Sequence, residues 1–154
     1  METVSKANVF FNKGSDKWKT PKSLYEKLDG EFFFDDFDPC PIDWKEGDPD
    51  GLMIEWATNT FVNPPFSKLD DWIKKANDEW KKGKTVVLLM NAKTHIPSFH
   101  EYVLKSPVEI RFVKGKVNFE QEGRTKKSNN PWSTMVLIWR KEKSPGFIDL
   151  TFQK

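Results

Sequence analysis

The chain has 154 residues, 37% of them hydrophobic and 31% charged, which is typical of one globular domain of ordinary size. No apolar run is long enough for a transmembrane helix, and residues 1–14 lack the hydrophobic stretch of a signal peptide, so we expect a soluble, cytoplasmic protein. The single cysteine, Cys40, excludes an intramolecular disulfide and a zinc site built from two or four cysteines. Residues 1–15 are polar and without pattern, so we expect a flexible arm ahead of one domain over residues 16–154.

The net charge of +2 conceals an uneven distribution. Residues 26–55 contain eleven acidic residues and two lysines, a charge of −9, so the rest of the chain carries +11. A cationic face that binds nucleic acid would account for this imbalance, and so would lysines that only solvate helix faces.

The first predicted elements are a helix and a strand. Thr20 as N-cap and Pro21 at the first helical position predict a helix start, and Gly30 predicts its end. The phenylalanine-rich segment Glu31–Phe37 predicts a strand. A long polar connection follows over residues 41–58, and connections of this length inside a compact domain are commonly functional.

Strands and helices then alternate. Phe61 and Val62 predict a short buried strand, and the apolar face of residues 68–82 predicts a helix that Gly83 closes. The unbroken apolar run Thr85–Met90 is typical of a central parallel strand covered on both faces, and a short helix over Ser98–Lys105 comes next.

The last third of the chain is richer in predicted strands. Residues 109–119 alternate around Gly115 and predict a bent strand or hairpin arm, followed by a basic loop over residues 123–130. Residues 133–140 and 146–152 predict two further strands. The pattern predicts an α/β domain with a mostly parallel sheet and antiparallel C-terminal strands.

Asn63-Pro64-Pro65-Phe66 is the sharpest motif, placed where a predicted strand ends and open α/β sheets bind their ligands. The two prolines fix the backbone and remove two amide donors, so the Asn63 side chain and the Pro64 carbonyl can both point outward as acceptors. Two acceptors suit an exocyclic amino group, and Phe66 can stack on the ring that carries it. The alternative is a rigid turn in which Ser67 or Asp70 caps the next helix.

With this motif the chain resembles the phage-type (Dam-like) DNA N6-adenine methyltransferases, which use S-adenosylmethionine. Blocks in family order carry the resemblance: Asp16–Pro21, Phe34–Cys40, Phe61–Ser67, Thr85–Thr94, Glu109–Lys116 and Pro131–Trp139. It implies a minimal Rossmann-like methyltransferase domain that transfers a methyl group from S-adenosylmethionine to N6 of adenine in DNA, without a metal, in the cytoplasm of a phage's host cell. We favour a monomer.

The resemblance also implies roles for individual residues. Asn63, Pro64, Pro65 and Phe66 would form the catalytic motif, which stabilises charge on the amine of a flipped-out adenine. The residues implied to line the cofactor pocket are Trp18, Thr20, Pro21, Asp38, Pro39 and Cys40. The helix start at Thr20 suits the cofactor's carboxylate and Asp38 suits its ammonium group. A core or lid role for Trp18 and a turn cap at Asp38 are the alternatives.

The candidates for DNA binding are basic: Lys93, Lys114, Lys116, Arg124, Lys126 and Lys127. Lys93 and Lys116 stand where the family usually has arginine, so they keep the charge and lose the bidentate fork. Trp44 and Trp56 in the 42–57 connection could wedge into or stack on DNA, or belong to a cofactor lid or to the core.

Other functions are compatible with the same motif. Asn-Pro-Pro-Phe also suits methylation of RNA adenine or of protein glutamine, since both present the same two hydrogens. A nucleic-acid-binding module without catalysis is the other rival. His95 and His100 lack a third ligand at a suitable spacing, so we expect no metal site.

Overall fold

The computed structural model describes residues 19–115, 117, 132–140 and 148–149. The predicted arm over 1–15, Trp18 and the basic loop 123–130 lie outside these residues. In chain order the elements are α2 (Lys22–Phe32), β1 (Asn59–Val62), η1 (Phe66–Lys68), α3 (Leu69–Lys81), β2 (Thr85–Asn91), η2 (Phe99–Val103), β3 (Glu109–Phe112), β4 (Thr134–Trp139) and β5 (Ile148–Asp149).

The strands form one sheet in the order β1-β2-β4-β3-β5. β1 pairs parallel to β2, with Val62 opposite Leu88, and β3 pairs parallel to β5. β4 pairs antiparallel to both β2 and β3. Among the described strands β4 therefore runs against the other four, and with two parallel and two antiparallel pairings the sheet is mixed rather than mostly parallel in its pairing.

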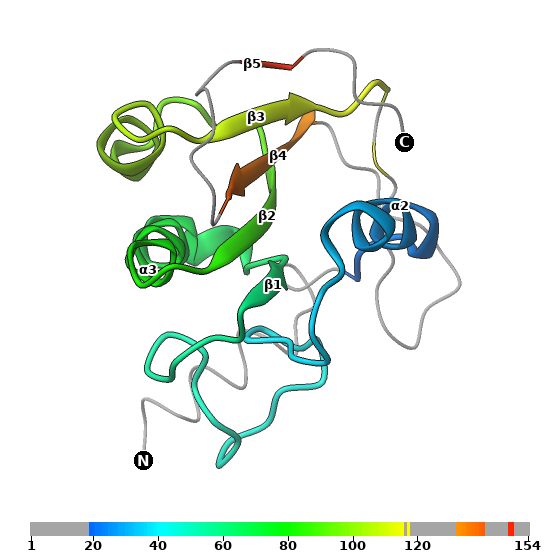
Figure 1. Ribbon diagram of the computed structural model, residues 1–154, viewed down its shortest axis with the longest axis vertical. Helices are drawn as coiled ribbons and strands as arrows, with labels where there is room; N and C mark the ends of the chain where they lie inside the picture. Colours follow the sequence, from blue (N-terminus) through cyan, green and yellow to red (C-terminus); the bar gives the residue numbers. More distant parts are fainter. Residues whose placement is uncertain (1–18, 116, 118–131, 141–147, 150–154) are drawn as a thin grey trace.

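The helices cover the two faces of the sheet, α3 on one side and α2 on the other (Figure 1). Successive side chains of a strand point to opposite faces, and β2 shows this clearly. Leu88 and Met90 belong to the apolar cluster with α3, whereas Val87 and Leu89 belong to the cluster with α2. The prediction that this apolar run forms a strand buried on both faces is confirmed.

The helix predicted over residues 68–82 is α3. Its apolar positions Leu69, Trp72, Ile73 and Ala76 are buried against the sheet. Asp70 and Asp71 lie in its first turn, where their negative charges interact favourably with the positive end of the helix dipole. Gly83 adopts a φ of +97° just beyond the end of the helix.

The start and end of α2 differ from the prediction. Pro21, not Thr20, is the N-cap residue; its carbonyl accepts the Tyr25 N–H at 3.1 Å. Gly30 lies inside the helix, which ends when Phe33 adopts a left-handed φ of 52° and donates its N–H to the Asp29 carbonyl at 2.8 Å.

The strand predicted over Glu31–Phe37 is therefore wrong. Leu24, Leu28 and Phe32 recur every fourth residue on one buried stripe of α2, and burial of Phe32 carries the helix past Gly30. Asp35 then meets the first residue of β1: its N–H donates to the Asn59 carbonyl and its Oδ2 accepts the Asn59 N–H. A run of phenylalanines fits both the 3.6-residue period of a helix and the two-residue period of a strand. The local sequence therefore did not distinguish a helix from a strand here.

Two later elements are shorter than predicted. The helix expected over 98–105 contains a π-helical turn, η2. The bent strand expected over 109–119 ends as β3 at Phe112, ahead of Gly115 at φ 76. Strands at the positions of β4 and β5 are confirmed.

The polar connection over residues 41–58 is anchored on the α3 side of the molecule. Trp56 is 2% exposed, donates its Nε1–H to the Gly51 carbonyl at 2.7 Å and stacks on Trp72 with ring centroids 6.1 Å apart. Trp44 donates its Nε1–H to the Pro49 carbonyl at 3.0 Å. Trp56 is thus a core residue, the last of the alternatives given for it.

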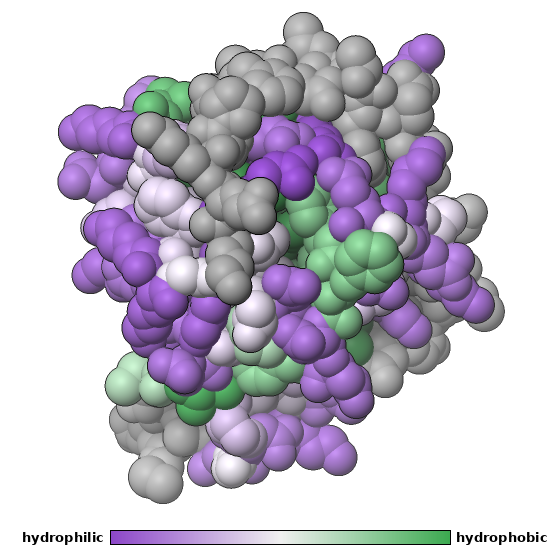
Figure 2. All heavy atoms as spheres, viewed as in Figure 1, coloured by the Kyte–Doolittle hydropathy of each residue, from purple (hydrophilic) through white to green (hydrophobic). Residues whose placement is uncertain are grey.

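Polar side chains cover most of the face seen in Figure 2, and hydrophobic ones gather there only in small areas. Within the part of the chain that the structure describes, no helix is long and apolar enough to cross a membrane.

Candidate active site

Asn63 stands where the chain leaves the sheet at the carboxyl end of β1. Val62 before it is fully buried, and Pro64 and Pro65 after it are buried too. A residue that precedes proline is held in an extended conformation, so the prolines fix the direction in which the chain leaves the strand. The Pro65 carbonyl accepts the Lys68 N–H at 3.2 Å and begins η1. The half-buried Asn63 side chain is thereby held at the edge of the sheet.

A hydrogen bond joins Asn63 to the segment that precedes α2. Asn63 Nδ2 donates to Thr20 Oγ1 at 3.0 Å, across 43 residues of sequence. In this arrangement the amide nitrogen of Asn63 faces Thr20 and the amide oxygen points the other way. Thr20 is therefore a partner of Asn63 rather than the N-cap that the sequence predicts.

Asp70, which the sequence predicts as a possible cap of the helix after Phe66, does not cap that helix. The N-cap residue of α3 is Lys68, which makes no side-chain cap hydrogen bond. Asp70 Oδ1 instead accepts the Ser98 N–H at 2.9 Å and ties α3 to the segment that leads into η2. The geometry around Phe66 is therefore not that of a helix start capped by Asp70.

Tyr25 of α2 packs against β1. Its ring lies edge-on to Phe61, two residues before Asn63, with centroids 5.2 Å apart. Burial raises the pKa of the Tyr25 phenol, and so do the nearby carboxylates, in the order Asp29, Asp38 and Asp36. The ring contact between Tyr25 and Phe61 places α2 beside the strand that leads to Asn63.

The segment of Asp38, Pro39 and Cys40 forms a tight turn. Asp38 Oδ1 accepts the Cys40 N–H at 2.9 Å, which is the turn-cap role given above as an alternative. The Pro39 carbonyl lies against Gly51, where a Cβ would come within 1.8 Å of it, and Cys40 packs on the apolar cluster of α3. Only glycine at position 51 allows this close approach.

A second group of predicted residues lies at the same edge of the sheet, where β2 and β3 end and β4 begins. The Ala92 N–H donates to the Ser133 carbonyl at 2.8 Å, and the Val113 N–H donates to the Thr134 carbonyl at 2.9 Å. The turns that carry Lys93 and Lys114 are thereby fastened to the start of β4.

The chain matches the family described as DNA N-6-adenine-methyltransferase (Dam) over residues 8–153, essentially its whole length. It belongs to the Dam family. The protein is accordingly an enzyme that methylates N6 of adenine in DNA, and nothing found supports RNA, protein glutamine or a non-catalytic role. No curated protein matches the chain.

In this Dam-family enzyme the structure brings some of the predicted residues together. Asn63 and Thr20 are bonded, Pro21 adjoins Thr20, and Lys93 and Lys114 lie in neighbouring turns. The structure does not describe the predicted residues Trp18, Lys116, Arg124, Lys126 and Lys127. Among the residues it does describe, no group of three or more His, Cys, Asp or Glu side chains could hold a metal ion.

Three features at this edge of the sheet were not predicted from the sequence. One is the Thr20–Asn63 bond, which no local signal announces because 43 residues separate the partners. Another is the cross-strand pair Asn91 and Thr134, both buried at this edge. The third is Trp132, whose ring Lys93 Nζ approaches to 5.3 Å from the centroid. Polar residues at strand ends were the available signal for Asn91 and Thr134.

Proposed function

We propose that S-adenosylmethionine is the methyl donor and that Asn63, Pro64, Pro65 and Phe66 form the site that holds the adenine amine. The Thr20–Asn63 hydrogen bond carries this proposal. It joins the segment that resembles the family's cofactor block to the segment that resembles its catalytic block, at the carboxyl edge where α/β sheets bind ligands.

Asn63 Oδ1 and the Pro64 carbonyl accept the two hydrogens of the N6 amino group. The lone pair of this amine is delocalised into the ring, so acceptors that favour positive charge on the nitrogen stabilise the transition state. Phe66 stacks on the base, which has to leave the duplex to reach the site. Thr20 keeps the amide of Asn63 oriented for this role.

The donor set at the start of α2 suits the methionine end of the cofactor. The first turn of α2 has no side-chain N-cap bond, so its N–H groups suit a carboxylate. Asp38 suits an ammonium group, and Pro39 and Cys40, which follow it in a tight turn, form the wall beside it. When bound, the cofactor supplies an electrophilic methyl group on its sulfonium. We place Trp18 at the same pocket on the resemblance alone.

The remaining assignments are proposals of the same kind. Lys93 and Lys114 contact DNA phosphates from this edge, joined by Lys116, Arg124, Lys126 and Lys127. A Rossmann-like arrangement is supported by strands β1, β2 and β3, which run in one direction with β4 reversed between β2 and β3. A cytoplasmic, phage-encoded enzyme completes the proposal.

The experiment is methyl transfer from labelled S-adenosylmethionine to unmethylated DNA, followed by digestion to nucleosides and mass spectrometry. We expect N6-methyladenine from the wild type and none from Asn63→Ala. Asn63→Asp keeps acceptor oxygens and loses the donor to Thr20, so we expect it to retain measurable product. Binding of the cofactor, followed by calorimetry, should survive in Asn63→Ala. Full activity of that variant would overturn the assignment of Asn63.

A further inference from the structure

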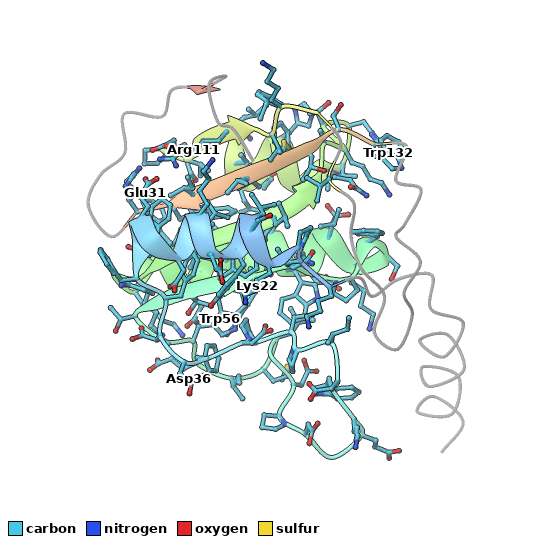
Figure 3. The ribbon with its side chains drawn as sticks, turned by 90° about the vertical axis from the view of Figure 1, so that its right-hand side faces the viewer. Lys22, Glu31, Asp36, Trp56, Arg111 and Trp132 are labelled. Carbon is cyan, nitrogen blue, oxygen red and sulfur yellow. The ribbon has the colours of Figure 1, made fainter. Side chains whose placement is uncertain are left out.

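Trp132 is a large side chain that the catalytic motif does not use. It is 43% exposed and stands two residues before β4 begins. Because β4 runs against β2 and β3, its start lies at their carboxyl ends, the edge where β1 presents Asn63. Figure 3 shows Trp132 at this end of the sheet, away from Glu31 and Arg111 at the other end.

The order of the strands places the start of β4, which Trp132 precedes, between two turns that each carry a lysine. β4 lies between β2, whose following turn carries Lys93, and β3, whose following turn carries Lys114. Lys93 Nζ lies 5.3 Å from the centroid of the Trp132 ring, a cation–π contact that holds the lysine at this edge. The hydrogen bonds from Ala92 and Val113 to the start of β4 fix the three turns relative to one another.

An exposed aromatic ring flanked by cations is the arrangement with which proteins bind unstacked nucleic acid. The ring stacks on a base of any identity, and the cations take the phosphates beside it. β2 lies between β1 and β4, so the backbones of β1 and β4 are about 10 Å apart, two strand spacings of about 4.8 Å. Because Phe66 is the side chain assigned to stack on the target adenine, we assign a different base to Trp132.

We propose that Trp132 stacks on a nucleobase of the DNA other than the target adenine, an inference that rests on the proposed function. Lys93 and Lys114 contact the phosphates on either side of that base. Flipping the target out breaks its stacking with its neighbours, and the indole replaces part of that lost contact. Trp132 is thus a substrate-positioning residue that acts on DNA binding rather than on the methyl transfer itself.

Binding of fluorescein-labelled oligonucleotides, unmethylated and either single- or double-stranded, tests this by fluorescence anisotropy. Trp132→Ala should weaken binding about tenfold or more, because stacking on one base is worth about 1–3 kcal/mol. Trp132→Leu, which keeps an apolar side chain without a π-face, should weaken binding similarly, and Trp132→Phe should restore most of it. In steady-state assays Trp132→Ala should raise KM for DNA and leave kcat nearly unchanged.

Salt dependence separates the ring from the lysines. Lys93→Ala and Lys114→Ala should each reduce the slope of log Kd against log salt by about one phosphate contact, whereas Trp132→Ala should leave that slope unchanged. Phe33→Ala, an exposed aromatic at the far end of α2, and Lys74→Ala, an exposed lysine on α3, are the matched controls and should bind as the wild type does.

Two results distinguish the two proposals. Wild-type affinity of both Trp132→Ala and Trp132→Leu would overturn the stacking role even if Asn63→Ala is inactive. Full activity of Asn63→Ala would overturn the catalytic assignment. Weakened DNA binding of the Trp132 variants would in that case still support a DNA contact at Trp132.

Discussion

At the scale of single residues, the proposed site depends on how one amide is oriented. Asn63 can offer an acceptor oxygen to the adenine amine only if its nitrogen is turned elsewhere, and Thr20 Oγ1 provides that partner at 3.0 Å. The sequence predicts Asn63 from the two prolines that follow it. It does not predict the role of Thr20, because the same threonine also suits a helix cap.

Thr20→Val tests this role, since valine keeps the shape and removes the acceptor. A net hydrogen bond is worth about 1 kcal/mol, so we expect kcat to fall about fivefold to tenfold with KM for DNA unchanged. Thr20→Ser should recover most of the lost rate. A raised KM for S-adenosylmethionine with an unchanged kcat would instead assign Thr20 to the cofactor.

At the scale of elements, the end of α3 is fixed to the connection before β1 by a buried carboxylate. Glu79 is fully buried, and it accepts hydrogen bonds from the Trp56 N–H at 2.7 Å and from the ammonium groups of Lys75, Lys82 and Lys84. Burial by itself raises the pKa of Glu79, but these hydrogen bonds outweigh it and lower the pKa to about 2.

Glu79→Gln should destabilise the protein by about 3–5 kcal/mol near neutral pH, because it leaves three lysines around a neutral group. A pKa of about 2, in place of the ordinary 4.5, makes the contribution of Glu79 complete above pH 4.5 and lost as the pH falls toward 2. Urea unfolding at several pH values should therefore show the gap between wild type and Glu79→Gln closing over that range. Asp78→Asn, an exposed acid on the same helix, should change little. A gap that stays constant down to pH 2 would contradict the prediction.

At the scale of the whole molecule, α2 is held at both ends. Thr20, just ahead of its start, meets Asn63, and Glu31 near its end binds Arg111 through two hydrogen bonds of 2.7 and 2.6 Å. Arg111 also donates to Glu109, to which Arg140 donates in turn, and the two guanidinium groups lie over the Phe32 ring. Hydrogen bonding to Arg111 lowers the pKa of Glu31 despite partial burial. Helix α2 thus links the segment of the proposed site to contacts at the opposite end of the sheet (Figure 3).

Arg111→Met should cost about 3–5 kcal/mol of stability, because it removes the main partner of Glu31 and leaves the buried Glu109 with less compensation. Lys22→Ala removes only an exposed pair with Glu26, and we expect a loss of about 0.5 kcal/mol or less. Thermal unfolding of both variants checks the contrast. Equal losses in the two variants would show that the buried network contributes no more than a surface pair.

The amphipathic pattern of α3, the apolar run of β2 and the motif Asn63–Phe66 were readable from the sequence by itself, because each depends on residues close together in the chain. The antiparallel direction of β4 agrees with the antiparallel C-terminal strands that the sequence predicts, whereas β5 pairs parallel to β3. The boundaries of α2 and the helical state of Glu31 and Phe32 were decided by tertiary structure, since burial against distant strands outweighs local preference. The same holds for the site. Local sequence names Asn63, whereas only the fold brings Thr20 to it across 43 residues and places Trp132 next to Lys93.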